Sequence, residues 1–186
     1  QLSGDQTRRA YVYVPQSYGE DPERRYPVMY FFDGQNIFFD DDAAFGTSWG
    51  MEGYMLESER EMILVAIECN REGSGRLEEY SPFTFENSEL GRIKGRGKQY
   101  MHWLIKELKP YIDETYRTLP DRENTMIAGS SMGGLMALYA ATTFNSVFQR
   151  AACLSPSLWV APGKILELIA RAHIRRDTCI YLDYGA

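Results

Sequence analysis

The chain has 186 residues, of which 44% are hydrophobic and 25% charged, and its formal net charge is −6. These values are typical of one folded, water-soluble domain over residues 1–186, and no run approaches the ~18 consecutive apolar residues of a membrane helix. The acidic balance argues against nucleic acid or an anionic membrane as a partner, because both bind concentrated Lys and Arg.

Short apolar runs rich in β-branched and aromatic residues alternate with helical patterns along the chain. Residues 11–14 alternate and predict an early, half-exposed strand. Near-continuous apolar runs, which suit strands buried on both faces, follow at residues 28–32, 63–67, 126–128, 151–154 and 179–182. The predicted fold class is therefore α/β, with a mostly parallel central sheet flanked by helices.

Helical periodicity is clearest over residues 98–117, where apolar residues recur at three- and four-residue steps. That spacing predicts a long amphipathic helix with Tyr111 on its apolar side, and Pro110 is expected to kink or break it. Two further helices are expected over residues 132–144 and 164–172. Residues 73–97 are polar, Gly-rich and unpatterned, which predicts a long surface loop of the kind that often forms part of a binding site.

Cys69, Cys153 and Cys179 lie far apart, each within or at the end of an apolar run, and no two have metal-ligand spacing. They are predicted to be buried thiols. An odd number without a disulfide framework favours a reducing compartment, and therefore a cytoplasmic location. The first residue is Gln1 and not Met, which leaves room for a removed leader and a secreted form.

Residues 124–139 contain the pattern Gly129-x-Ser131-x-Gly133 between a predicted strand and a predicted helix. This is the context of a nucleophile elbow, where the chain reverses so sharply that a Cβ on either flank of the serine would clash. Ser131 is therefore the candidate nucleophile. The alternative is a small-residue turn without chemistry, and Ser130 is the second candidate hydroxyl.

Free backbone N–H groups at the start of the following helix would face an oxyanion beside Ser131, and the N–H of Met132 is the expected first donor. A second donor should come from the loop after the first buried strand. There, Gly34 follows Asp33 and lets the backbone present the N–H of Gln35. The alternative for this loop is an ordinary type I or II turn.

Together, these residues resemble the esterase D type of α/β-hydrolase, which includes feruloyl, acetyl-xylan and siderophore esterases, S-formylglutathione hydrolase and the mycolyltransferases. The segments that carry the resemblance, in the family's order and spacing along nearly the whole chain, are residues 26–35, 76–82, 107–134 and 155–159. The resemblance implies an α/β-hydrolase fold and no metal or organic cofactor. The Asp-Gly-Gln loop and the Ser-Pro-Ser-Leu-Trp segment favour the siderophore and carbohydrate esterase branches.

The resemblance also implies roles for single residues. Ser131 would be the nucleophile, with Gln35 and Met132 as backbone oxyanion donors. The residues that it places around the acyl or leaving-group pocket are Arg76, Tyr80, Ser157 and Trp159. Two alternatives stay open: Arg76 as a solvated charge or a partner of Glu78 or Glu79, and Trp159 as an aromatic at the edge of the core.

An acyl-transfer triad needs a carboxylate and a histidine after the serine in the chain. The two histidines do not suit this role, because His102 falls on the polar stripe of the long helix with Lys109, and His173 follows the last predicted helix. In the family the acid lies just after the strand that matches residues 179–185, and Asp183 matches a position inside that strand. We therefore expect the chain to be part of a longer esterase, lacking the last strand and helix of the fold.

The leading hypothesis is a serine carboxylic-ester hydrolase that acts on a small-molecule ester through an acyl-enzyme on Ser131. Acyl transfer to a sugar or alcohol on the same scaffold is one alternative. A binding domain that kept the fold without the triad is another. An uncovered edge of the sheet favours self-association, so a homo-oligomer is also among the expected states.

Overall fold

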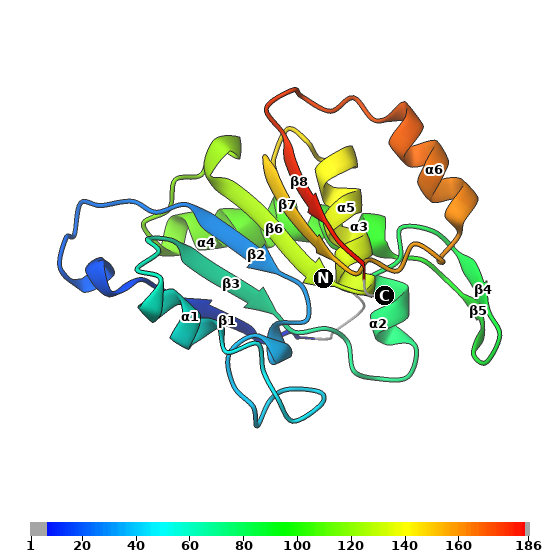
Figure 1. Ribbon diagram of the computed structural model, residues 1–186, viewed down its shortest axis with the longest axis horizontal. Helices are drawn as coiled ribbons and strands as arrows, with labels where there is room; N and C mark the ends of the chain where they lie inside the picture. Colours follow the sequence, from blue (N-terminus) through cyan, green and yellow to red (C-terminus); the bar gives the residue numbers. More distant parts are fainter. Residues whose placement is uncertain (1–6, 185–186) are drawn as a thin grey trace.

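The computed structural model describes residues 7–184 and has a six-stranded sheet at its centre (Figure 1). Its order is β1-β3-β2-β6-β7-β8, with β1 antiparallel to β3 and every other neighbouring pair parallel. The strands are β1 (Ala10–Tyr13), β2 (Val28–Phe31), β3 (Ile63–Ile67), β6 (Thr125–Ser130), β7 (Arg150–Leu154) and β8 (Cys179–Leu182). The predicted α/β class with a mostly parallel sheet is confirmed.

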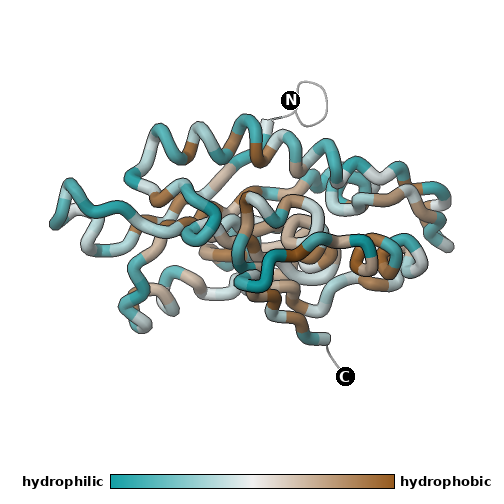
Figure 2. Tube along the Cα trace, turned by 90° about the horizontal axis from the view of Figure 1, so that it is seen from above, coloured by the Kyte–Doolittle hydropathy of each residue, from teal (hydrophilic) through white to brown (hydrophobic). Residues whose placement is uncertain are grey.

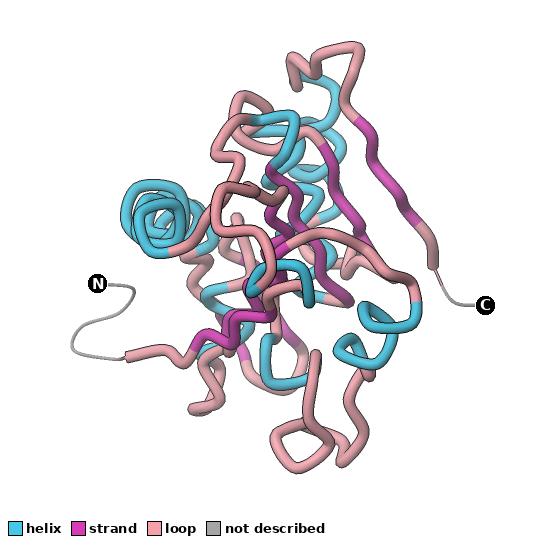
Figure 3. Tube along the Cα trace, turned by 90° about the vertical axis from the view of Figure 1, so that its left-hand side faces the viewer, coloured by secondary structure: helices cyan, strands magenta, loops and turns pink. Residues whose placement is uncertain are grey.

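Helices lie on both sides of the sheet (Figure 3). One face packs against α5 (Met132–Thr143) and against the long helical segment that starts with α3 (Gly97–Trp103). The other face packs against α1 (Met51–Glu57), through Met55. Hydrophobic stretches gather in the middle of the molecule and hydrophilic ones on its outer loops (Figure 2). Helix α5 is buried on nearly all sides, which explains why its sequence carries no amphipathic stripe.

The long predicted helix forms as one continuous run in three parts. Helix α3 passes into a π-helical turn, η3 (Leu104–Leu108), and then into α4 (Lys109–Thr115). Pro110 has no N–H and its ring would clash with the carbonyl four residues earlier, and a wider turn before it relieves both problems. Two expected orientations were wrong: Tyr111 is exposed, and Lys109 is buried because its ammonium donates to Asp113 and to the carbonyl of Pro120.

Residues 73–97 are more regular than predicted. They contain α2 (Gly75–Glu79) and a hairpin of β4 (Phe85–Asn87) and β5 (Gly91–Ile93). These elements are too short for hydrophobic periodicity to be visible, which is also why α1 escaped prediction. Short 3-10 turns, η1 (Gln16–Gly19), η2 (Gly34–Asn36) and η4 (Arg122–Asn124), join the larger elements.

The last strand is the least covered part of the sheet. Cys179 and Tyr181 of β8 are exposed, whereas Cys69 and Cys153 are buried. The prediction that all three thiols are buried was therefore wrong for Cys179, because β8 is an edge strand that pairs only with β7 among the described residues. Helix α6 (Pro162–Arg171) precedes β8 and lies at the periphery (Figure 1). Within residues 7–184, no helix has the length and apolarity that crossing a bilayer requires.

Candidate active site

Ser131 lies in a strained turn between β6 and α5. Its backbone has φ 57° and ψ −117°, which L-residues with a side chain rarely adopt. Three main-chain hydrogen bonds hold this conformation. The N–H of Ser131 donates to the carbonyl of Leu154 (2.9 Å), and the carbonyl of Ser131 accepts from the N–H groups of Leu135 (3.0 Å) and Ser157 (2.9 Å). Strain maintained by surrounding bonds is typical of functional sites.

Glycine is required on both sides of the serine. A Cβ on Gly129 would lie 2.5 Å from the carbonyl carbon of Gly133, and a Cβ on Gly133 would lie 2.9 Å from the Cβ of Phe32. Gly129 lets strand β6 lie this close to helix α5, and Gly133 lets the helix lie this close to the segment after β2. The sharp strand-to-helix reversal predicted from the motif is thus what residues 129–133 adopt.

The N-terminus of α5 points its unpaired amides toward the serine turn. Ser131 is the residue before the helix, so the N–H of Met132 is the first amide of the helix. Within residues 7–184, it donates to no acceptor. An unpaired amide at a helix N-terminus attracts developing negative charge. Met132 therefore places an unpaired N–H directly after Ser131, at the start of α5.

The second predicted donor, Gln35, lies in the turn η2 that follows the neighbouring strand β2. Strands β2 and β6 pair in parallel, so the turn after β2 and the turn at Ser131 share one edge of the sheet. Gly34 is essential there, because a Cβ on it would lie 2.3 Å from the carbonyl carbon of Ala66. The side chain of Gln35 is anchored to Cys69: its Oε1 accepts the N–H of Cys69 (3.2 Å), and its Nε2 donates to the thiol (3.3 Å). The N–H of Gln35 donates to no acceptor within the described residues.

A cleft of about 670 Å³ opens at this edge of the sheet. It brings together Ser131, Gln35 and Arg76 of the predicted site, and Ser130 reaches it as well. The remaining lining comes from two loops: Asn36, Ala44, Phe45, Thr47 and Trp49 from the segment after β2, and Cys69, Asn70, Arg71 and Gly73 from the segment after β3, together with Asp33. Ligands bind at the carboxyl ends of strands in open α/β sheets, and this cleft has that location.

Arg76 has a partner other than those considered from sequence. Its Nε and Nη2 donate to the two carboxylate oxygens of Asp33 at 2.7 and 2.8 Å, a bidentate ion pair. The alternative that Arg76 pairs with Glu78 or Glu79 was wrong, since Glu78 contacts Arg96 and Glu79 contacts Arg8.

Tyr80 is fully buried, so its predicted contact with substrate is corrected. Its hydroxyl accepts the main-chain N–H of Asp33 at 3.0 Å. The ring packs edge-on against Phe32 and Tyr100, with centroids 5.1 and 5.4 Å away. Tyr80 therefore lies behind the turn that starts at Asp33 rather than in the cleft.

Ser157 and Trp159 belong to the loop after β7. The hydroxyl of Ser157 lies 3.1 Å from that of Ser131, and either can donate the hydrogen bond. Ser157 is thus at the nucleophile, although it is buried. Trp159 is 58% exposed, packs edge-on against Phe85, and does not line the cleft. This position agrees better with the alternative of an aromatic at the edge of the core than with a pocket residue.

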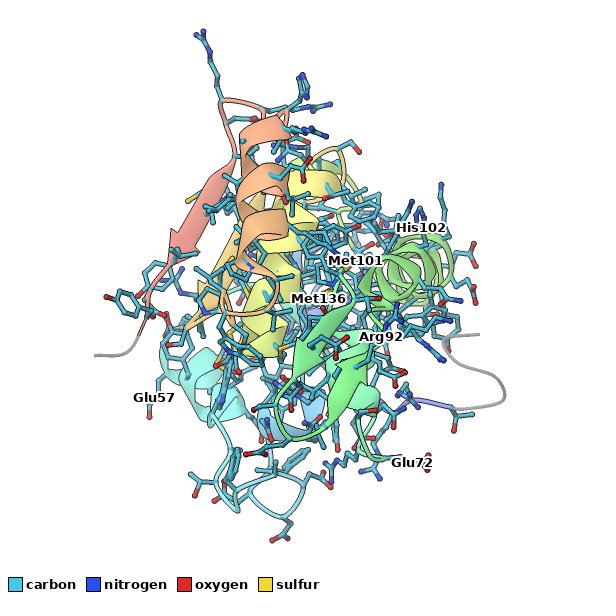
Figure 4. The ribbon with its side chains drawn as sticks, turned by 90° about the vertical axis from the view of Figure 1, so that its right-hand side faces the viewer. Glu57, Glu72, Arg92, Met101, His102 and Met136 are labelled. Atoms are coloured by element: carbon cyan, nitrogen blue, oxygen red, sulfur yellow. The ribbon has the colours of Figure 1, made fainter. Side chains whose placement is uncertain are left out.

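Neither histidine lies at the cleft. His102 is exposed on α3, where its ring contacts Phe144 (Figure 4). Its neighbour Met101 is instead buried, as is Met136 of α5. His173 lines a separate groove between the end of α5 and α6. Asp183 instead accepts the N–H of Ser155 at 2.7 Å, and so supports the loop that carries Ser157.

Most of the cleft residues escaped assignment from the sequence, among them Phe45 and Cys69. Cys69 follows β3 by two residues, and this location at the carboxyl end of a buried strand was the available signal. Burial, and then the nearby charge of Asp33, raise the pKa of the Cys69 thiol to about 12. The thiol is therefore protonated at neutral pH and is a structural contact rather than a second nucleophile.

Comparison with known proteins finds a family model, described as "Putative esterase", that matches residues 3–186. Uncharacterized protein YbbA of Bacillus subtilis (strain 168) is 25% identical over 154 residues, which cover 82% of this chain and 58% of YbbA. Among solved structures, an IroE-like serine hydrolase from Shewanella oneidensis aligns with a TM-score of 0.71 at 23% identity, over 88% of this chain and 50% of its own.

The siderophore hydrolase EstA from Aspergillus nidulans aligns with a TM-score of 0.69 at 21% identity, over 91% of this chain and 59% of its own. Identities this low show a shared fold. The chain thus spans between half and three fifths of the length of these three relatives.

Proposed function

Because the chain belongs to the esterase family whose model it matches over residues 3–186, we propose that it carries the nucleophile and oxyanion hole of a serine carboxylic-ester hydrolase. The observation that supports this most directly is the strained turn at Ser131, whose hydroxyl lines a cleft beside the unpaired N–H groups of Met132 and Gln35. This arrangement suits acyl transfer, in which negative charge develops on the carbonyl oxygen.

In the proposed reaction, the Ser131 oxygen bonds to the acyl carbon of the ester while its proton passes to a general base. The carbonyl oxygen becomes an oxyanion and accepts from the two N–H groups. The alcohol leaves with a proton returned by the same base, and water then hydrolyses the acyl-enzyme. Removing one oxyanion donor raises such a barrier by about 3 kcal/mol.

The general base is assigned to neither histidine of the chain. His102 and His173 lie on other surfaces, and no conformational change of a side chain would bring an exposed residue of α3 to the carboxyl edge of the sheet. The hydroxyl of Ser157, 3.1 Å from that of Ser131, orients the nucleophile but is too weak a base to accept its proton.

The substrate is proposed to be a small-molecule ester of the siderophore or carbohydrate type. Two features of the cleft support this. Phe45 and Trp49 offer aromatic surface for a ring, and Arg71 and Arg76 offer donors for a polar or anionic group. The names of the solved relatives, among them a siderophore hydrolase, point in the same direction.

The competing hypothesis is a binding domain without catalysis. It is favoured by one observation: within residues 7–184, no histidine lines the cleft that Ser131 lines. The two functions predict different chemistry at Ser131, because only an activated serine reacts with a fluorophosphonate.

The test is labelling by a fluorophosphonate probe, with the modified residue located by peptide mass spectrometry. We expect stoichiometric modification of Ser131 in the complete gene product, lost in Ser131→Ala and retained in the matched control Ser130→Ala. Failure of the complete gene product to label would favour the binding domain. Labelling that survives Ser131→Ala would show that another group is the nucleophile.

A further inference from the structure

Asp33 has a backbone conformation that needs external support. It is not a glycine, yet it has φ 55° and ψ 48°, in the left-handed region. Such a conformation is unfavourable by roughly 1 kcal/mol for a residue with a side chain, and persists only where neighbouring groups hold it. Asp33 directly precedes Gly34 and Gln35, so its backbone angles set where the N–H of Gln35 lies.

Two residues from the segment after β3 hold Asp33. The Tyr80 hydroxyl accepts its main-chain N–H, and the Arg76 guanidinium binds both oxygens of its carboxylate. The guanidinium also lies over the Tyr80 ring, 5.6 Å from its centroid, so the three side chains form one connected unit. Both ends of Asp33, its amide and its carboxylate, are therefore fixed from outside the turn.

The other end of the turn is fixed too. The side chain of Gln35 is held by the amide and thiol of Cys69, and the N–H of Asn36 donates to the carbonyl of Asp33 at 2.9 Å. The Asp33 carboxylate also faces the start of α5, since a Cβ on Gly133 would lie 3.2 Å from its Oδ2. These contacts thus fix the position of the turn that carries Gln35, which lies against the helix that carries Met132.

We propose that Tyr80 and Arg76 are positioning residues that place the N–H of Gln35 for oxyanion binding, an inference that rests on the proposed function. Tyr80 has no exposed surface, so it acts only through Asp33 and not by touching a substrate. Arg76 lines the cleft, but its Nε and one terminal nitrogen are engaged by Asp33. Preorganised donors are effective because they need no rearrangement in the transition state.

Tyr80→Phe is the sharpest test, because it removes one hydroxyl and keeps the ring that packs against Phe32 and Tyr100. In the complete gene product acting on p-nitrophenyl acetate, we expect kcat to fall about tenfold with KM within twofold, since a misplaced donor affects the transition state alone. Affinity for phenylboronic acid, which forms a tetrahedral adduct on an activated serine, should fall in parallel. Arg76→Lys, which keeps the charge without the bidentate fork, should retain more activity than Arg76→Ala.

The matched control is Tyr30→Phe. Tyr30 is also fully buried, and its hydroxyl has no hydrogen-bond partner within the described residues, so kcat and boronate affinity should stay unchanged. Urea midpoints measured for every variant separate folding from catalysis. Unchanged kcat in Tyr80→Phe, or a loss confined to KM, would overturn the positioning role while leaving the esterase intact. A wild-type protein that neither hydrolyses the ester nor reacts at Ser131 would overturn the proposed function and this inference with it.

Discussion

Substitution of Gly129 by alanine tests the steric basis of the serine turn. The added Cβ would lie 2.5 Å from the carbonyl carbon of Gly133, 2.6 Å from its oxygen and 2.9 Å from its Cα. Carbon atoms in contact prefer about 3.5–4.0 Å, so the overlap is about 1 Å. All three atoms are backbone, at the start of the buried helix α5, and no side-chain rotation relieves the collision.

Overpacking of this kind destabilises proteins by about 1–3 kcal/mol, and we expect the upper end because strand and helix must move apart. A loss of about 3 kcal/mol corresponds to a fall in Tm of roughly 6–12 °C for a chain of this size. Fluorophosphonate labelling of Ser131 should also fall in Gly129→Ala, because moving α5 away from β6 displaces the N–H of Met132 from the serine.

Urea denaturation followed by tryptophan fluorescence measures the change, with Gly53→Ala as the matched control. Gly53 lies in α1, has no atom within 4 Å of an added Cβ, and has no positive φ. Alanine there should stabilise the protein by about 0.4–1 kcal/mol, through the unfolded chain and helix propensity. Equal urea midpoints for Gly129→Ala and the wild type, or an equal loss in Gly53→Ala, would refute the steric reasoning.

The remaining predictions concern thiols and one buried arginine. Iodoacetamide at pH 8 should modify exposed Cys179 much faster than Cys69 or Cys153, as peptide mass spectrometry will show; equal rates would contradict the burial of the last two. Burial raises the pKa of both inner thiols from 9.0 to about 12, so unfolding releases protons in that range. The free energy of unfolding should therefore stay constant below about pH 9 and fall between pH 9 and 12, with a shallower fall in Cys153→Ala. An equally steep fall in that variant would show that the buried Cys153 thiol does not cause the pH dependence. Arg122→Ala should destabilise the protein by about 3 kcal/mol in urea titrations, because the buried guanidinium donates to the carbonyl of Asn145 and the side chain of Thr178. A loss below about 1 kcal/mol would show that these hydrogen bonds are dispensable.

Local patterns in the sequence were enough for the central sheet and for the sharp turn at Ser131. Ile63–Ile67 and Cys179–Leu182 form with the predicted bounds, and the other strands differ by a residue or two at their ends. The runs of the inner strands β2, β3, β6 and β7 are apolar because neighbouring elements cover these strands, so burial is written into each of these runs. The turn at Ser131 was equally visible, since Gly129 serves a close approach to Gly133 within the same short segment.

Roles within the site were a different matter. Arg76 was expected beside a substrate or beside a glutamate near it in the chain, and Tyr80 in the pocket. Both hold Asp33, which lies 43 and 47 residues away, although Arg76 also lines the cleft as expected. No pattern within a short window can report such a pairing, because it depends on how the loops after β2 and β3 pack together.

What the sequence by itself determined was therefore the strands of the central sheet and the sharp turn at Ser131, since both follow from burial and sterics over a few neighbouring positions. Only the tertiary structure decided which side chains reach the cleft and which support it from behind. Two contacts illustrate this: Gln35 meets Cys69, 34 residues away, and Ser131 meets Ser157, 26 residues away. They form because β2 pairs in parallel with β3 and β6, and β6 with β7, so that the carboxyl ends of these strands lie at one edge of the sheet. Proximity of that kind is a property of the folded sheet and not of any segment in it.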